Sequence, residues 1–107
     1  MASIASIAQV CKSKNAGPFF FTIDVVFEKK EMFERVRATN VLKAELFADL
    51  YKVDLADVQF TIYPAALAFK ATVPRRIPAG EIGDSDVYGA QQHAPLLAVD
   101  IPINDLD

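Results

Sequence analysis

Apolar side chains occupy every second position from Phe19 to Phe27, and most of the positions between them are apolar as well. Alternation over a short run is typical of a β-strand. The segment 19–28, FFFTIDVVFE, is therefore the clearest strand in the chain. Because both of its faces are largely apolar, we predict that this strand lies in the centre of a sheet.

The hydrophobic period becomes helical after Lys29. Met32, Phe33 and Val36 are spaced as on one helix face, and Thr39–Asn40 look like a break. A second set then repeats with the same period, which predicts an amphipathic helix. Its members are Leu42, Leu46, Phe47, Leu50 and Tyr51.

The remaining apolar runs are short. Segments 59–63, 66–73 and 96–103 are predicted to be strands, whereas residues 4–11 fit either a strand or a helical turn. Glycine, proline and polar residues indicate loops at 12–18 and 74–95. The second loop is long for a small domain, and such loops often carry function.

Helices grouped between strands predict one domain, residues 1–107, of the α+β class. We expect a ferredoxin-like sandwich in which a mostly antiparallel sheet has its helices on one face. If one apolar face of the strand at 19–28 lacked a cover of helices, it would become an oligomer interface.

Composition excludes several classes of function. The 107 residues carry a net charge of −3, which argues against nonspecific nucleic-acid binding. No apolar run approaches the length of a membrane span, and the N-terminus lacks the pattern of a secretory signal, so we expect a cytoplasmic protein. The single cysteine, Cys11, excludes an intramolecular disulfide and a cysteine-based zinc site.

The first candidate for chemistry is the predicted loop SKNAGP at 13–18. Backbone N–H groups before a buried strand can bind an anion, with Lys14 adding a charge and Asn15 an amide. The alternative is an ordinary turn with Gly17 at positive φ and Asn15 capping its own backbone. The motif is neither a dinucleotide fingerprint nor a P-loop, and we expect no cofactor.

The second candidate is the segment DSDVYGAQQHAP at 84–95. His93, the only histidine, is suited to acid or base catalysis near neutral pH, and Tyr88 could donate to a developing oxyanion. Gln91 and Gln92 add two amides beside them. The alternative is a structural loop whose polar side chains satisfy turns and buried backbone groups.

A metal site is a weaker alternative in the same segment. Asp84, Asp86 and His93 could supply ligands, but their spacing matches no established pattern, and one histidine is few for a transition metal. We therefore predict no metal.

The arginine pair at 75–76 and the single cysteine each have two competing interpretations. Arg75 and Arg76 could pair with an acidic ligand or partner, or could be solvated guards of a strand edge. Lys12 could lower the pKa of Cys11, or Cys11 could be a small buried hydrophobe.

The motifs SKNAGP and DVYGAQQHAP give the chain a resemblance to a short bacterial family of unknown function. The resemblance runs from Ile7 to Ile101. The order of elements also resembles, more weakly, the C-terminal ferredoxin-fold domain of acyclic-terpene-utilisation protein A. That domain begins with a Ser-Gly-Asp-Lys-Gly loop, of which this chain keeps Ser13 and Gly17.

This weaker resemblance implies a small accessory subunit that completes a site on a large acyclic-terpene-utilisation-type partner. The substrate would be an acyl-CoA or hydroxy-acid metabolite. We expect Ser13, Lys14, Gly17, Gln91 and Gln92 to bind it.

Two other functions remain open. One is a self-sufficient homo-oligomeric lyase or isomerase, with His93 as acid/base, Tyr88 and Asn15 stabilising an oxyanion, and Lys14 holding a carboxylate. The other is a non-catalytic assembly module. A shared site requires the two motifs to meet, and they would do so if strands 19–28 and 96–103 were parallel neighbours.

Overall fold

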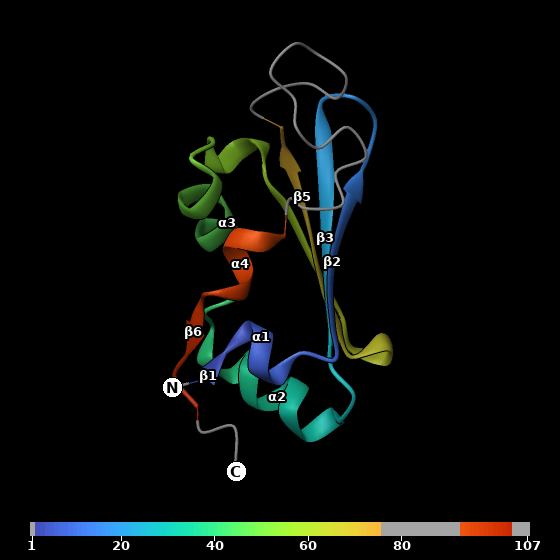
Figure 1. The fold of residues 1–107 in the computed structure, drawn as a ribbon, viewed down its shortest axis with the longest axis vertical. Coiled ribbons are helices and arrows are strands. Elements are labelled where there is room, and N and C mark those ends of the chain that lie inside the picture. Colours follow the sequence, from blue (N-terminus) through green and yellow to red (C-terminus); the bar gives the residue numbers. More distant parts are fainter. Residues whose placement is uncertain (1, 76–92, 104–107) are drawn as a thin grey trace.

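A four-stranded antiparallel sheet forms the larger half of the molecule (Figure 1). The computed structural model describes residues 2–75 and 93–103. The strand order is β2-β3-β5-β4, with β2 and β4 at the edges. The strands are β2 (Val10–Asn15), β3 (Phe20–Val26), β4 (Gln59–Tyr63) and β5 (Ala68–Pro74).

The strand predicted at 19–28 is β3, and its central position is confirmed, because it pairs with β2 on one side and β5 on the other. The predicted loop at 12–18 is wrong in its first half. Residues up to Asn15 continue β2, and only the segment after it turns, with Gly17 at a φ of 80°. Polar residues are tolerated in this strand because it lies at an edge of the sheet, beside one other strand and not between two.

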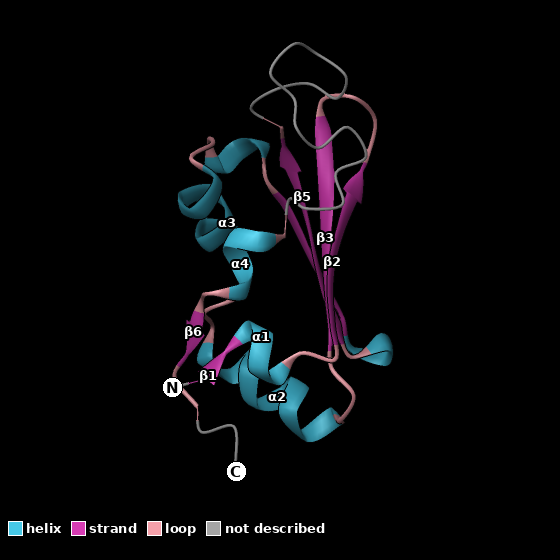
Figure 2. Ribbon diagram, in the orientation of Figure 1, coloured by secondary structure: helices cyan, strands magenta, loops and turns pink. Residues whose placement is uncertain are grey.

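Two helices connect the hairpins, as the periodicity predicted. They are α2 (Lys30–Thr39) and α3 (Ala44–Tyr51), joined at Asn40, which adopts the left-handed conformation that ends many helices. Short 3-10 turns, η1 (Leu55–Asp57) and η2 (Pro64–Ala66), flank β4. The helices lie on one side of the sheet (Figure 2), so the α+β class with an antiparallel sheet is confirmed.

The two ends of the described chain meet in a second, two-stranded sheet. β1 (Ala2–Ser3) pairs with β6 (Asp100–Ile101), and the short helices α1 (Ile4–Ile7) and α4 (Ala94–Leu97) pack beside them. The predicted strand at 96–103 is therefore wrong in its first part, whereas Asp100–Ile101 within it do form a strand, β6. Pro95 suits the first turn of a helix, and the following apolar residues pack as a helical turn with Leu96 fully buried.

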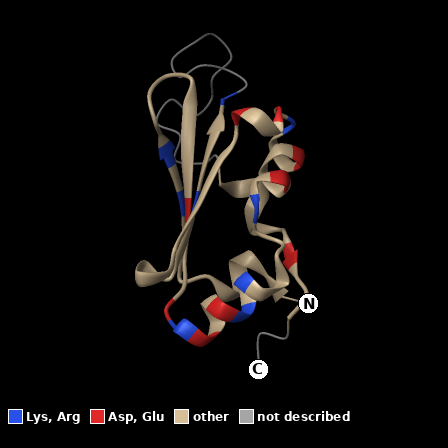
Figure 3. Ribbon diagram, turned by 180° about the vertical axis from the view of Figure 1, so that it is seen from behind, with Lys and Arg blue, Asp and Glu red and all other residues tan. Residues whose placement is uncertain are grey.

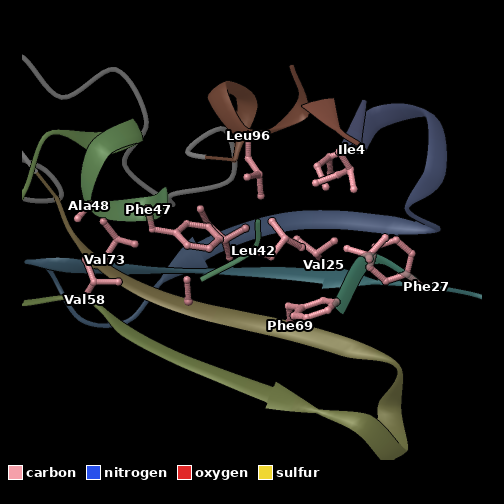
Figure 4. Close-up of a cluster of buried hydrophobic side chains, with 14 of the residues drawn as sticks. Ile4, Val25, Phe27, Leu42, Phe47, Ala48, Val58, Phe69, Val73 and Leu96 are labelled. Atoms are coloured by element: carbon pink, nitrogen blue, oxygen red, sulfur yellow. The ribbon is translucent and has the colours of Figure 1, made fainter. Parts of the chain in front are cut away.

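The core lies between the helices and the inner face of the large sheet. In Figure 4, Leu96 and Ile4 point toward the sheet from α4 and α1. Aromatic rings fill the part of the core between β5 and α2. The ring centre of Phe69 lies 5.9 Å from that of Phe27 and 5.0 Å from that of Phe33. Burial of this many large apolar side chains is the main source of stability in a chain of this size.

The outer face of the sheet is mixed in character. Lys12, Asp24 and Lys70 stand side by side across β2, β3 and β5, because they are direct cross-strand partners. Figure 3 shows basic and acidic positions on the strands and along the helices. The face without a cover of helices is thus partly polar, and not the largely apolar face described from the sequence of this strand.

Candidate functional site

Three polar side chains form a row on the inner face of β2. Cys11, Ser13 and Asn15 are opposite Val25, Ile23 and Phe21 of β3, all of which belong to the core. Direct cross-strand partners share one face of a sheet. The row, which we call the β2 polar row, therefore faces the helices and not the open side.

Lys14 lies on the other face of the sheet. Its cross-strand partner is Thr22, so it points away from Ser13 and Asn15. The structure does not bring this lysine together with the rest of the predicted binding residues. Gly17 lies beyond the strand in an exposed turn, and among the described residues other than its chain neighbours no atom lies within 4 Å of where its Cβ would be. Its positive φ matches the interpretation as a turn.

Ser13 joins the two motifs that the sequence singled out. Its Oγ lies 3.2 Å from Nδ1 of His93 and accepts the backbone N–H of His93 at 3.1 Å. Ser13 is only 8% exposed and His93 is half-buried. The two motifs do meet, but through α4 rather than through parallel strands.

Asn15 binds Arg75, the residue that follows β5. Nη1 of Arg75 donates to Oδ1 of Asn15 at 2.5 Å, and the Arg75 backbone N–H donates to the carbonyl of Phe19 at 2.8 Å. Arg75 is 8% exposed, so its interpretation as a solvated edge guard is wrong. A guanidinium only donates hydrogen bonds, which fixes the orientation of the Asn15 amide.

The third member of the row, Cys11, lies near Tyr51 of α3. Burial raises the pKa of the Cys11 thiol to about 11, and burial together with the nearby Cys11 raises the pKa of Tyr51. Both groups are therefore neutral at pH 7. Cys11 packs against the core, as expected of a buried hydrophobe, and Lys12 is on the opposite face.

Tyr51 has a further contact that positions its ring. The ring meets Phe21 edge-on, with centroids 5.1 Å apart. The sequence analysis counted Tyr51 only among the apolar positions of a helix. Its place at the C-terminal end of α3, opposite the polar row, could not be read from helical spacing.

Several candidates lie outside the described residues, namely Arg76, Asp84, Asp86, Tyr88, Gln91 and Gln92. Within residues 2–75 and 93–103, no group of three or more histidine, cysteine, aspartate or glutamate side chains could hold a metal ion. In the same ranges, no helix is long and apolar enough to cross a membrane.

The arrangement combines two kinds of chemistry on one strand face. His93 offers an imidazole suited to proton transfer near neutral pH. Arg75 offers a guanidinium and Asn15 an amide, and such donors suit an anionic oxygen. Sequence reasoning had named His93, Ser13 and Asn15 as site residues. It left open whether Arg75 binds an acidic group or guards a strand edge, because the burial of this residue depends on the strand that lies beside it.

The class of protein is a small α+β domain with a polar row on the inner face of an edge strand. The chain belongs to the family described as Domain of unknown function (DUF4387), which matches residues 4–100. This match confirms the resemblance to a short family of unknown function. No curated protein and no solved structure matches the chain.

Proposed function

We propose that this protein is a small accessory subunit. It would bind a large partner of the acyclic-terpene-utilisation type, in the cytoplasm, and complete a site for an acyl-CoA or hydroxy-acid metabolite. The proposal involves neither nucleic acid nor a membrane. The observation that carries it is the position of the Ser13–His93 and Asn15–Arg75 pairs next to each other on an edge strand.

The edge position favours a shared site. A strand at the edge of a sheet has one side without a strand neighbour and can adjoin another chain. Beside the site, Phe19 is 60% exposed and Phe20 is 40% exposed. The backbone carbonyl of Phe19 accepts the backbone N–H of Arg75, which holds the main chain beside the site. Exposed aromatic side chains are enriched at the centres of protein interfaces.

The ligand class follows from the donors. Hydroxy acids carry a carboxylate and acyl-CoA thioesters develop an oxyanion when they react, and both suit Arg75 and the amide of Asn15. His93 would move a proton to or from the metabolite. Ser13, Lys14, Gly17, Gln91 and Gln92 remain predicted binding residues, with Lys14 the least favoured because it lies on the outer face.

The test is to co-express the chain with such a partner and measure co-elution by size exclusion at micromolar concentration. We compare the wild type with a double variant, Phe19→Ser with Phe20→Ser. Tyr63→Ser is the matched control, because Tyr63 is 47% exposed at the opposite end of the sheet. We expect the wild type and Tyr63→Ser to co-elute with the partner and the double variant to elute alone.

Separate elution of the wild-type chain and the partner would refute the proposal. If the complex forms, His93→Ala should preserve co-elution and lower turnover at least tenfold, in the range typical of general acid–base groups. Unchanged turnover in both His93→Ala and Asn15→Ala would indicate a non-catalytic assembly module instead.

A second function is favoured by the same histidine contact. The Ser13–His93 pair needs no partner chain to form, which fits a self-sufficient homo-oligomeric lyase or isomerase. His93 would be the acid/base, and the amide of Asn15, with Tyr88, would stabilise the oxyanion. A wild-type chain that elutes as a homo-oligomer and turns over a hydroxy acid alone would select this function.

A further inference from the structure

We propose that two copies of this chain associate through the β4 edge, the side of the Gln59–Tyr63 backbone that faces away from β5. The occupant of this edge is a second copy of β4, paired antiparallel, so that two four-stranded sheets join into one. This inference goes beyond the proposed function and does not rest on it, because that function uses β2 at the opposite edge of the sheet.

The hydrogen bonds of β5 show which of its residues bond each neighbouring strand. In an antiparallel pair, residues bond their partner strand at every second position. The N–H of Arg75 donates to the carbonyl of Phe19 at 2.8 Å, and the N–H of Phe27 donates to the carbonyl of Leu67 at 2.9 Å. Odd-numbered residues of β5 therefore bond β3, and even-numbered residues bond β4.

The backbone of β4 divides in the same way. Its partners for the even-numbered residues of β5 are Gln59, Thr61 and Tyr63. The backbone N–H and C=O groups of Phe60 and Ile62 consequently point away from the sheet. In the part of the chain that the structure describes, β5 is the only strand beside β4, which is the last strand of the sheet in Figure 4.

The β4 edge carries no charge. The chain has no lysine, arginine, aspartate or glutamate from Val58 to Phe69. Charged side chains, lysine above all, are a common protection of exposed edges against pairing with another chain. Two copies of a chain with a net charge of −3 repel one another, and a neutral edge is where that repulsion is weakest.

The other edge strand has the protection that β4 lacks. Pairing β2 with a second β2 about Ser13, near its centre, would place Lys12 directly opposite Lys14. Like charges directly opposite each other destabilise a pair of strands. Self-association therefore uses one edge only and closes as a symmetric dimer, without adding further copies.

The sequence of β4 complements itself in the antiparallel register centred on Thr61. In that register each of the 5 residues of the strand has a partner in the second copy. Phe60 lies opposite Ile62 on the inner face, and each such pair exchanges both of its backbone hydrogen bonds. Gln59 lies opposite Tyr63 on the outer face, and Thr61 lies opposite Thr61, a favourable pair.

Apolar surface beside the β4 edge supports an interface there. Phe60 and Ile62 pack against the core but are only half-buried. Leu55, shortly before β4, is 49% exposed, and Tyr63 at its end is 47% exposed. Removal of part of this surface from water adds to the backbone hydrogen bonds of the paired strands.

The experiment measures the oligomeric state of the full-length protein by sedimentation velocity from micromolar to millimolar concentration. We expect a monomer–dimer equilibrium. Amide hydrogen exchange, followed by NMR, then locates the interface. The amides of Phe60 and Ile62 should exchange more slowly as the dimer forms, because each donates to the second copy, and faster again on dilution.

Three variants test the register. Thr61→Lys places two lysines opposite each other with a Lys70 beside each, so it should weaken the dimer at least about tenfold. Mixing it with Thr61→Glu should restore a dimer, because opposite charges then meet. Gln59→Lys is the matched control, since it adds the same charge to an exposed position of the same strand, opposite Tyr63, and should dimerise as the wild type does.

The proposal is overturned if the wild type stays monomeric, or if it dimerises while the amides of Phe60 and Ile62 keep their monomer exchange rates. Equal dimerisation of Thr61→Lys and the wild type, no dimer in the mixture, or loss of the dimer in Gln59→Lys would also overturn it. If Thr61→Lys does not fold, the two amides of the wild type still decide the question. Separate elution from the large partner concerns the other edge, so the two proposals fail separately.

Discussion

The two edge strands of the sheet, β2 and β4, differ in what they present to the helices. The inner positions of β4 are Phe60 and Ile62, which extend the aromatic core. Phe60 lies with its ring centre 5.8 Å from that of Phe47. The inner positions of β2 are the polar row of Cys11, Ser13 and Asn15.

This difference shows that the polar row is not a general property of an edge. Each edge strand lies beside a strand of the core, β3 for β2 and β5 for β4, and β4 uses its inner positions for packing. Polar groups facing a core are costly unless they are hydrogen-bonded. On β2, Ser13 is bonded to His93 and Asn15 to Arg75, and both partners are far away in the sequence.

The largest effect should come from removing an inner side chain of β4. Phe60→Ala should lower the free energy of unfolding by about 3 kcal/mol, because it opens a cavity beside Phe47 and Phe69. Urea denaturation measures the change. The ¹⁵N NMR signals of the His93 imidazole should stay as in the wild type, because β4 and β2 lie at opposite edges of the sheet. A change in these signals would mean that the two edges are coupled.

A second test concerns the thiol at the start of the polar row. Because burial raises the pKa of Cys11 from 9.0 to about 11, the thiolate fraction at pH 8 is lowered roughly 100-fold. Alkylation of native protein by iodoacetamide should therefore be slower by about that factor than alkylation of protein unfolded in urea. Equal rates would place the thiol in water and contradict its position in the row.

The same pKa gives the direction of a pH effect on stability. The pKa is higher in the folded state, so the folded protein binds more protons above pH 9. The contribution is present in full below the unfolded pKa and is lost as the pH rises through about 11. In urea denaturation at increasing pH, Cys11→Ala should lose less stability over this window than the wild type.

The smallest effect should come from the outer face of β2. Lys14→Ala should change the free energy of unfolding by less than about 0.5 kcal/mol, because Lys14 is exposed and lies opposite Thr22. It should also leave turnover of the complex within about twofold. A large loss of turnover would show that the ligand reaches around the strand to the outer face, and would restore Lys14 as its carboxylate partner.

Periodicity predicted most of the fold. The alternation in β3 and the helical spacing in α2 and α3 are local patterns, and each was confirmed at nearly the predicted bounds. The errors fell where a pattern had no clear period. KSKN at 12–15 looked like a loop because it is polar, and LLAV at 96–99 looked like the start of a strand because it is apolar.

The sequence by itself determined the class of fold, the central strand and the two motifs, because these depend on residues that are near one another along the chain. Only the tertiary structure decided which groups of those motifs meet. A strand separates its residues onto two faces, so it divides Ser13 and Asn15 from Lys14. Long-range packing then brings Arg75 and His93 to the inner face, a pairing across 60 and 80 residues that no local pattern contains.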